Sequence, residues 1–407
     1  MKLLVVSQYF WPEDFRINDV VRSLVEKGVE VDVLTGKPNY PDGKVFPGYR
    51  AWGCQVEMQQ GASLFRVPLF PRSTRSGWRL ALNYISFVIS GVIWGSWLLR
   101  KRNYDVVFVY APSPILAAIP AIFLSWRRGL PLVLWVQDLW PASLSATGYV
   151  KNRMILKSVE GIVRWIYCSS DKILVQSLAF VTDVRKLAPR APIEYFPNSV
   201  DSGFAMIPEP RAVHVDIPAL DQGFCVVFAG NVGAAQAVEV IVRAALLLKE
   251  YTEIRFVVLG KGSRWDWMHD QIQTLNLTNL YLPGRFPVET MPGVMQKAGA
   301  LLVTLANEPI FALTVPNKLQ AYLASGRPII ACLNGEGARV VSEAQAGLSV
   351  PAQDHKALAT AVLQLYQMSA QDRARLGANG RQYFNENFDH DRLVDQLLVH
   401  LQTMTDT

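Results

Sequence analysis

The chain has 407 residues, half of them hydrophobic and 18% charged, and its 40 basic and 34 acidic residues give a net charge of +6. This composition excludes intrinsic disorder, which needs low hydrophobicity and a high net charge. The length is too great for one ordinary hydrophobic core and suits two domains of roughly 150–200 residues. The positive charge is local, because residues 58–137 hold nine basic residues and one acidic residue, a net +8, and the rest of the chain sums to −2.

Cysteine and histidine placement narrows the compartment and the chemistry. The four cysteines lie far apart without a CxxC motif, which indicates reduced thiols in a cytosolic protein. The first apolar run is too short for a signal peptide, and Glu13 and Asp14 stand where a cleavage site would lie. All five histidines lie in the C-terminal half and none forms an HExxH motif. A Ser-His-Asp site within the first half and a zinc site of the HExxH type are therefore excluded.

The first half alternates apolar strands with helices. Residues 2–7 predict a strand, 17–27 a helix that Gly28 ends, and 29–34 the next strand. Further strands are predicted at 106–110, 132–136, 172–175 and 193–196. This order is typical of a parallel, doubly wound sheet.

The same rhythm restarts after residues 201–223, a proline-rich stretch without periodicity that is interpreted as a linker. A helix is predicted at 237–249, and strands at 225–230, 254–260, 280–282, 301–303, 328–332 and 348–350. Residues 379–402 predict a helix that packs across the domain junction. The predicted fold class is α/β, with two Rossmann-like doubly wound domains that face each other across a cleft.

Ligands of such sheets bind at the carboxyl ends of the strands. The loop after the first strand, QYFWPEDFR, is bulky and lacks the GxGxxG glycines that a dinucleotide needs, so an NAD enzyme is not expected. In the second domain, Gly230, Asn231 and Gly233 follow a strand, and Gln236 stands near the start of the next helix. Glycines before a helix N-terminus favour an anion site, and an ordinary tight turn is the alternative.

Two more loops of the second domain carry candidate residues. Gly260, Lys261, Gly262 and Arg264 follow the next strand and suit a phosphate or nucleoside, although a solvated turn would look the same. Arg285 and Phe286, after the strand at 280–282, are counted with the same donor-binding set.

A third feature is the helix that begins at Pro316 and Asn317 and ends at Gly326. Lys318 lies in its first turn, where the helix dipole disfavours a cation. A lysine is tolerable there when an anion lies between it and the helix N-terminus, which makes Lys318 a candidate anion-binding residue.

These motifs resemble those of glycosyltransferase family 4, which has the GT-B fold. The resemblance is carried by PNKLQAYLASGRPIIA, FAGNVGAAQAVEVIVRAA and GEGARVVSEAQAGLSVPAQD in the second half. SQYFWPEDFRINDVVRSLVEKGVEVDVLTGKPNYP and VQDLWP in the first half are similar to the bacterial colanic-acid and O-antigen fucosyl- or N-acetylfucosaminyltransferase group. The resemblance covers nearly the whole chain.

It implies a retaining, metal-independent hexosyltransferase without a cofactor. A UDP- or GDP-linked sugar would be held by a C-terminal domain at 206–380, and the acceptor by an N-terminal domain at 1–205. Residues 381–407 would pack back toward the N-terminal domain.

Several donor-site positions depart from the family pattern. Lys318 matches the lysine that contacts the donor diphosphate. Asn231, Gly233 and Gln236 occupy the loop where relatives often place an arginine and a lysine. Ala321 and Leu313 stand where the paired glutamates are usual, and Glu308 and Glu336 lie nearby at a different spacing.

On the acceptor side, Asp138 ends a strand where relatives often have a histidine. It is a candidate for orienting or deprotonating the acceptor hydroxyl, and capping of the following turn is the alternative. Glu13 and Arg16, in the loop that borders the acceptor side, are further candidates, with a surface ion pair as the alternative.

Residues 80–99 contain no charge and are long enough to cross a bilayer as a helix. Cations flank both ends, and Gly91 and Gly95 fit GxxxG. A single span would put two halves of one sheet on opposite sides of a membrane, so we expect residues 72–102 to lie in or on the inner leaflet, against anionic head groups. The alternative is a buried helix. Cations that bracket apolar sequence do not suit nucleic acid.

The predicted function is sugar transfer from a nucleotide sugar to a lipid-linked saccharide in surface polysaccharide or O-antigen biosynthesis. The enzyme would be cytoplasmic, peripheral or monotopic on the inner face of the cell membrane. Two alternatives are a nucleotide-sugar 2-epimerase of the same fold and a catalytically silent membrane scaffold.

Overall fold

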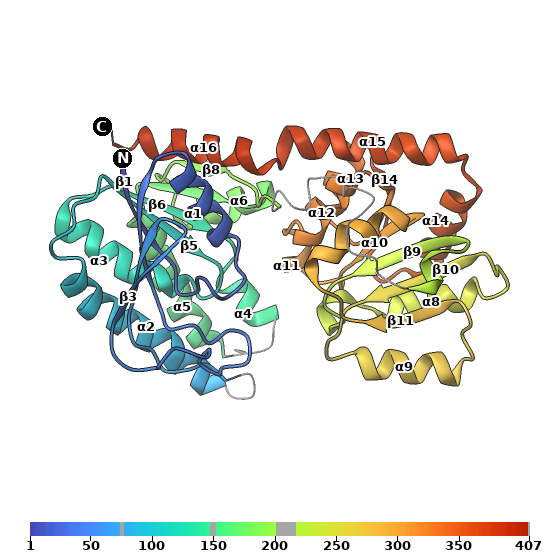
Figure 1. Cartoon of the computed structure of the whole chain (residues 1–407), viewed down its shortest axis with the longest axis horizontal. Helices are drawn as coiled ribbons and strands as arrows, with labels where there is room; N and C mark the ends of the chain where they lie inside the picture. Colours follow the sequence, from blue (N-terminus) through green and yellow to red (C-terminus); the bar gives the residue numbers. More distant parts are fainter. Residues whose placement is uncertain (74–76, 147–151, 201–216, 406–407) are drawn as a thin grey trace. The chain divides into compact units, whose positions relative to one another are not determined.

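The computed structural model describes residues 1–73, 77–146, 152–200 and 217–405, and these form two compact units (Figure 1). Unit 1 comprises Met1–Pro197 and Asp391–Thr407, and unit 2 comprises Asn198–His390. Each unit has its own parallel sheet with helices on both faces. The predicted α/β class with two doubly wound domains is confirmed.

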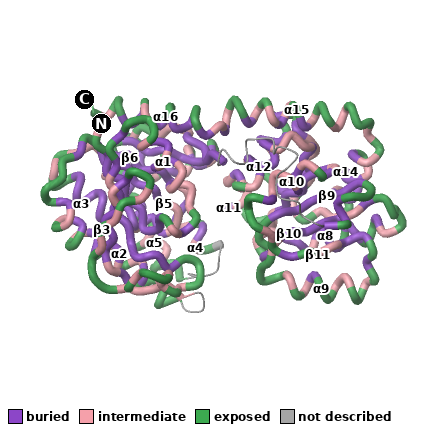
Figure 2. Tube along the Cα trace, in the orientation of Figure 1, coloured by how far each residue is buried: buried purple, intermediate pink, exposed green. Residues whose placement is uncertain are grey.

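Unit 1 holds an eight-stranded sheet in the order β3-β4-β2-β1-β5-β6-β7-β8, parallel except for the pairing of β3 with β4. Its strands are β1 (Lys2–Val6), β2 (Glu30–Thr35), β3 (Gln55–Gln59), β4 (Ala62–Arg66), β5 (Val106–Ala111), β6 (Leu132–Val136), β7 (Lys172–Val175) and β8 (Ile193–Tyr195). Most strand residues are buried, because helices cover both faces (Figure 2).

The helices of unit 1 form two layers. They are α1 (Ile17–Glu26), α2 (Gly77–Leu98), α3 (Ala118–Arg128), α4 (Ala142–Ala146), α5 (Arg153–Cys168), α6 (Leu178–Leu187) and α16 (His390–Gln402). Leu3 and Val5 share a hydrophobic core with α1 and α16 on one face of the sheet. α2 and α3 pack against the other face, where Gly95 of α2 lies on Leu34 of β2.

Unit 2 holds a six-stranded, all-parallel sheet in the order β11-β10-β9-β12-β13-β14. Its strands are β9 (Phe224–Ala229), β10 (Ile254–Leu259), β11 (Leu280–Gly284), β12 (Ala300–Thr304), β13 (Ile329–Cys332) and β14 (Gly347–Val350). Its helices are α8 (Glu239–Leu247), α9 (Trp265–Thr274), α10 (Met291–Lys297), α11 (Pro309–Ala312), α12 (Asn317–Ser325), α13 (Glu336–Glu343), α14 (His355–Gln367) and α15 (Ala370–Asn387).

The structure corrects the sequence prediction in several elements. β3 and β4 form a hairpin that was not predicted, and its two turn residues, Gln60 and Gly61, both have positive φ. The helix predicted at 379–402 is two helices, α15 in unit 2 and α16 in unit 1. The expected boundary at residue 205 lies outside the described residues, and the units divide at Pro197.

Candidate functional site

Each unit carries a cluster of loops at the carboxyl ends of its strands, where doubly wound sheets bind ligands. In unit 2 the first two loops follow the neighbouring strands β9 and β10. Gly230 donates its amide to the Leu259 carbonyl at 2.8 Å, and Gly260 donates to the Gly284 carbonyl at 2.8 Å. A Cβ on Gly260 would lie 1.8 Å from the Gly230 oxygen, and φ there is +136°. Glycine is therefore required for the two loops to pack together.

The sequence predicted that the loop after β9 leads directly into a long helix, and the structure shows a different connection. A 3₁₀ turn, Ala234–Gln236, intervenes, and α8 begins at Glu239. The Asn231 amide donates to the Gln236 side-chain oxygen at 3.1 Å, and a Cβ on Gly233 would lie 2.6 Å from that same amide. Asn231, Gly233 and Gln236 are thus brought together. They form a neutral polar loop and not a cationic clamp.

Lys318 lies in the first turn of α12, beside this loop. Its ammonium nitrogen is 3.7 Å from the centroid of the Phe228 ring and would be 2.9 Å from a Cβ on Gly230. The nitrogen is buried and has no hydrogen-bond partner among the described residues. Burial lowers the pKa of Lys318 to about 7. A buried ammonium without a counter-charge is costly unless an anionic ligand arrives.

Two contacts hold α12 in place. The Tyr322 hydroxyl accepts the Ala229 amide at 2.9 Å and donates to the Ala229 carbonyl at 3.3 Å, which fastens α12 to the last residue of β9. Asn317 follows the N-cap residue Pro316 and accepts a hydrogen bond from the Asn198 amide at 3.1 Å. The motif PNKLQAYLASG therefore places Lys318 by packing as well as by sequence.

The other predicted donor residues are more peripheral. Lys261 is exposed, and Arg264 pairs with Glu239 of α8 at 3.2 Å. Gly262 packs tightly on the loop after β9, since a Cβ there would lie 2.4 Å from the Val232 oxygen. Arg285 is exposed and Phe286 packs on the core.

No predicted carboxylate replaces the paired glutamates. Ala321 is buried in the core of unit 2 and Leu313 ends α11. Both oxygens of Glu336 accept hydrogen bonds from the Arg339 guanidinium, at 3.0 and 2.9 Å. Glu308, just before α11, is exposed.

In unit 1 the candidate Glu13 is buried, and its carboxylate connects two loops through hydrogen bonds. Its Oε1 accepts the amides of Asn39 and Tyr40, both at 2.7 Å, and its Oε2 accepts the Phe10 amide at 3.2 Å. Burial raises the pKa of Glu13 to about 7, and these amides oppose the shift. Glu13 is 2% exposed, so it is a buried residue and not part of a surface pair as the alternative supposed.

The two other acceptor-side candidates lie beside strand ends. Arg16 directly precedes α1, and its charge opposes the rise that burial imposes on the pKa of Tyr110. Asp138 follows β6, and burial raises its pKa while hydrogen bonds from the Ser143 side chain and the Leu139 amide lower it. Those contacts are the ones that the capping alternative predicts, and they leave the acceptor role of Asp138 a hypothesis.

Sequence reasoning missed a polar cluster at the carboxyl end of β1. The Gln8 amide donates to the Asn83 side-chain oxygen at 2.7 Å, and the Asn83 amide donates to the Phe70 carbonyl at 2.7 Å. Gln8 Oε1 and Arg72 Nε are buried without a hydrogen-bond partner among the described residues. The available signal was Asn83 itself, a strongly polar residue inside the uncharged segment 80–99.

Comparison with protein families gives two matches. The model described as a glycosyl transferase 4-like domain matches residues 15–199, and the model described as glycosyl transferases group 1 matches residues 223–368. The first match falls almost entirely in unit 1 and the second in unit 2. Together they account for most of the chain.

Among curated proteins, the chain is similar to WbjE of Pseudomonas aeruginosa, named as a glycosyltransferase, with 24% identity over 78% of this chain and 79% of that protein. It is also similar to WcaI of Escherichia coli K12, named as a colanic acid biosynthesis glycosyl transferase, with 24% identity over 80% of this chain and 82% of that protein.

Solved structures share the fold. Sucrose-phosphate synthase from Thermosynechococcus elongatus matches with a TM-score of 0.78 at 17% identity, over 100% of each chain. HepE of Anabaena in complex with UDP matches with a TM-score of 0.70 at 13% identity, over 99% of this chain and 100% of that one.

Proposed function

We propose that this chain, which belongs to the family 4 glycosyltransferases of the GT-B fold, moves a fucose- or N-acetylfucosamine-type sugar from a nucleotide-sugar donor to a lipid-linked saccharide. The reaction would retain the anomeric configuration, need no metal, and serve surface polysaccharide biosynthesis. The name of WcaI supports the polysaccharide role, and the UDP bound to HepE supports a nucleotide donor.

The environment of Lys318 is the main support for binding of a nucleotide-sugar donor. Its buried ammonium has no partner among the described residues, and it lies against Gly230, at the carboxyl end of β9. A nucleoside diphosphate placed there supplies the missing counter-charge, and the interaction strengthens as the sugar–phosphate bond breaks and negative charge develops on the diphosphate. Lys318 is thus the residue expected to contribute most to the rate.

The protein groups around the lysine set its geometry. Tyr322 fastens α12 to β9, and the glycines after β9 and β10 allow close approach of the backbone to phosphate oxygens. The polar loop of Asn231 and Gln236 offers amide groups where relatives carry cations. Recognition of the sugar hydroxyls would then depend on amides, because Ala321 and Leu313 supply no carboxylate.

For the acceptor we assign unit 1. Asp138 would orient the acceptor hydroxyl and take its proton, and its raised pKa makes it a better proton acceptor than an exposed aspartate. Gln8 Oε1 and Arg72 Nε, buried and without partners among the described residues, are polar groups that a saccharide can satisfy.

The lipid part of the acceptor is proposed from α2. In the part of the chain that the structure describes, α2 is the one helix that is long and apolar enough to cross a bilayer. Of its most apolar 18-residue stretch, 28% is buried inside the protein and the rest is not. Phe87, Gly91 and Gly95 are buried, with Gly91 against Pro120 of α3 and Gly95 against Leu34 of β2. The opposite side exposes large apolar residues, including Ile85, Ile89 and Ile93. We therefore infer a helix that lies in the inner leaflet and does not span it.

A donor panel tests the function. Purified protein is incubated with UDP- and GDP-linked sugars, with and without a lipid-linked saccharide, and the products are separated by chromatography. Nucleoside diphosphate release that needs the acceptor supports transfer, and a changed nucleotide sugar without acceptor supports the epimerase. Lys318→Ala should reduce transfer about 100-fold or more, with Lys356→Ala, at an exposed position of α14, as the control. Full transfer by Lys318→Ala would contradict the diphosphate role.

A further inference from the structure

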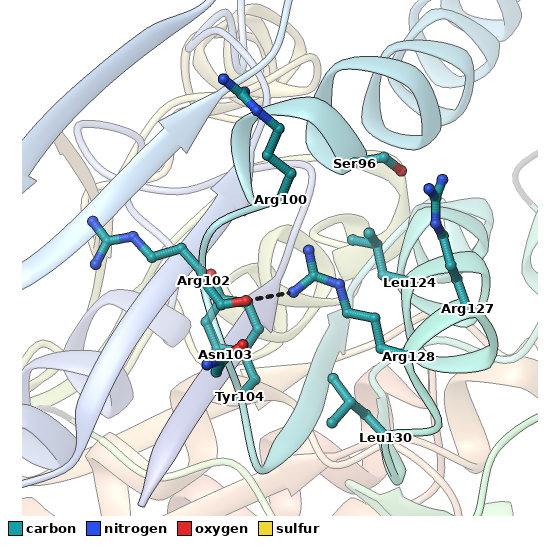
Figure 3. Close-up of a pocket in the computed structure, with 9 residues that line it drawn as sticks. All are labelled: Ser96, Arg100, Arg102, Asn103, Tyr104, Leu124, Arg127, Arg128 and Leu130. Atoms are coloured by element: carbon teal, nitrogen blue, oxygen red, sulfur yellow. Dashed lines mark hydrogen bonds between the residues drawn. The ribbon is translucent and has the colours of Figure 1, made fainter.

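A basic pocket lies at the C-terminal ends of α2 and α3, away from the residues described above (Figure 3). Its volume is about 530 Å³, and four arginines line it: Arg100, Arg102, Arg127 and Arg128. In Figure 3, the side chain of Arg128 reaches from the end of α3 to the backbone carbonyl of Arg102. Nothing in the proposed sugar transfer uses this pocket.

The positive charge of the pocket is only partly neutralised. Asp32 is the one carboxylate paired with any of the four arginines in the described ranges, at 3.6 Å from Arg102, and it also accepts the Tyr104 hydroxyl at 2.8 Å. The exposed side chain of Arg127 has neither a hydrogen bond nor an ion pair within the described residues. Because one carboxylate pairs with one of the four guanidinium groups, the pocket keeps an excess of positive charge that favours an anion.

Capping of the helix ends is a competing explanation for these arginines. Arg128 donates to the carbonyls of Leu99 and Arg102, at 2.8 and 2.9 Å, and Arg100 donates to the Trp97 carbonyl at 2.6 Å. Cations at helix C-termini are favourable on dipole grounds. Each guanidinium has five N–H donors, however, so these bonds leave most of the donors available. The caps pre-orient two of the arginines and do not consume the site.

The position in the sheet excludes the reacting end of the acceptor as the ligand. Residues 102–104 and Leu130 of the pocket come just before β5 and β6, so the pocket lies at the amino edge of the sheet. The Gln8 cluster lies at the carboxyl edge. Asn83 of that cluster and Ser96 of the pocket are 13 residues apart on α2, which is about 20 Å along the helix.

The surroundings of the pocket indicate a lipid surface. Arg100 stacks on Trp97, 4.4 Å from its ring, and Trp97 belongs to the exposed apolar side of α2. Trp126, beside Arg127 on α3, is 79% exposed. Tryptophan next to arginine is typical of the interface between lipid head groups and acyl chains, where the phosphates of anionic lipids lie.

We propose that this pocket binds the phosphate of an anionic phospholipid head group while the exposed side of α2 lies among the acyl chains. The arginines hold the phosphate through the donors that helix capping leaves free. The inference rests on the proposed membrane location. It adds a head-group site that fixes how unit 1 lies on the bilayer.

Vesicle binding by the full chain tests this site. Vesicles of phosphatidylcholine alone and of phosphatidylcholine with phosphatidylglycerol are compared by sedimentation. Wild-type protein should prefer the anionic vesicles, and Arg100→Gln with Arg127→Gln should weaken that binding about 30-fold, at about 1 kcal/mol per arginine. The control, Arg243→Gln with Lys356→Gln, removes two exposed charges from unit 2 and should bind like wild type.

A second variant separates a pocket from a diffuse basic surface. Arg100→Lys with Arg127→Lys keeps the charge but loses the bidentate geometry, so binding to anionic vesicles should stay several-fold weaker than wild type. Full binding by the lysine variant, or equal binding of wild type to both vesicles, would overturn the proposal. Donor hydrolysis without vesicles should be unchanged in all variants, and its absence in wild type would count against the transferase proposal instead.

Discussion

Two buried charged side chains, Glu13 and Lys318, show opposite states of satisfaction. Glu13 accepts three backbone amides and so needs no ligand. Lys318 has an aromatic ring beside it and no hydrogen-bond partner within the described chain. A buried polar group without a partner in the protein alone is the better candidate for ligand binding. The sequence predicted both residues as site residues, and the structure favours Lys318.

Nucleoside diphosphate binding should take up protons through Lys318. Burial lowers its pKa to about 7, so at pH 8 most of the free protein carries a neutral amine. The bound diphosphate favours the ammonium and raises the pKa, so binding should take up close to one proton per site at pH 8 and almost none at pH 6. Calorimetry of UDP or GDP binding in buffers of different ionisation enthalpy measures this uptake.

The reference for this experiment is Lys318→Met, which cannot take up the proton. The pH dependence of uptake in wild type should therefore be absent in the variant. Equal uptake by both proteins at pH 8 would show that another group, such as the ligand phosphate, takes the proton. Lys318→Met should also raise Tm by a few degrees at or below pH 7, because an unpaired buried ammonium is removed.

Replacing Glu13 should affect stability more than chemistry. Glu13→Ala leaves three buried amides without an acceptor, and we expect a loss of about 3 kcal/mol in the free energy of unfolding. Denaturant titration followed by tryptophan fluorescence measures it. Glu26→Ala, at an exposed position of α1, is the control and should change stability little. A Glu13→Ala protein of normal stability with no transfer activity would instead support the acceptor-side role.

At the scale of elements, helix α2 has a buried side that packs inside unit 1 and an opposite side that exposes large apolar residues. Asn83, Phe87, Gly91 and Gly95 are buried at helical spacing. A Cβ on Gly91 would lie 2.7 Å from Pro120 of α3, so the GxxxG pair serves packing inside unit 1. The pattern is the same one that favours helix association in membranes, and the sequence alone could not separate the two uses.

A larger residue at Gly95 should therefore lift α2 from the sheet. A Cβ there would lie 2.9 Å from Leu34 Cδ2, and Gly95→Ile adds three more carbons. We expect a loss of roughly 1–3 kcal/mol from overpacking, measured by thermal unfolding. Gly77→Ile, where a Cβ meets nothing within 4 Å, is the matched control. Unchanged stability in Gly95→Ile would indicate that α2 does not depend on this contact.

The strands and loops were predictable to different degrees. The strands predicted at 132–136 and 172–175 matched β6 and β7 residue for residue, because strands buried on both faces read as nearly continuous apolar runs. The β3–β4 hairpin was missed because the apolar residues of β3, Val56 and Met58, are its exposed ones, and its turn, Gln60-Gly61, is not a pair typical of hairpins. The position of Lys318 in the first turn of a predicted helix made it a candidate. That its ammonium has no hydrogen-bond partner, and that Gln8 contacts Asn83, could not be predicted, because both depend on elements distant in sequence.

At the scale of the whole molecule, charge and apolar exposure coincide. The +8 segment of residues 58–137 contains α2 and α3, and these helices carry the exposed Trp97 and Trp126 with the arginine pocket between their ends. Five of the nine basic residues in this segment, Arg100, Lys101, Arg102, Arg127 and Arg128, lie at the C-terminal ends of these two helices, so this surface of unit 1 carries much of the excess positive charge. This charge would draw unit 1 to an anionic bilayer with the exposed apolar side of α2 facing the lipid. Unit 2 is near neutral and would not be attracted in this way.

Removing two apolar side chains from this surface should release the protein from membranes. Ile89 and Ile93 are 54% and 57% exposed, so Ile89→Ser with Ile93→Ser should weaken vesicle binding roughly 30-fold, at about 1 kcal/mol for the exposed part of each side chain. Unlike the arginine variants, this variant should lose binding to neutral and anionic vesicles alike. Leu247→Ser with Val288→Ser, at positions of unit 2 that are 50% and 51% exposed, is the control and should bind as wild type does. Wild-type protein recovered from cells in the soluble fraction, without detergent or high salt, would contradict the membrane location.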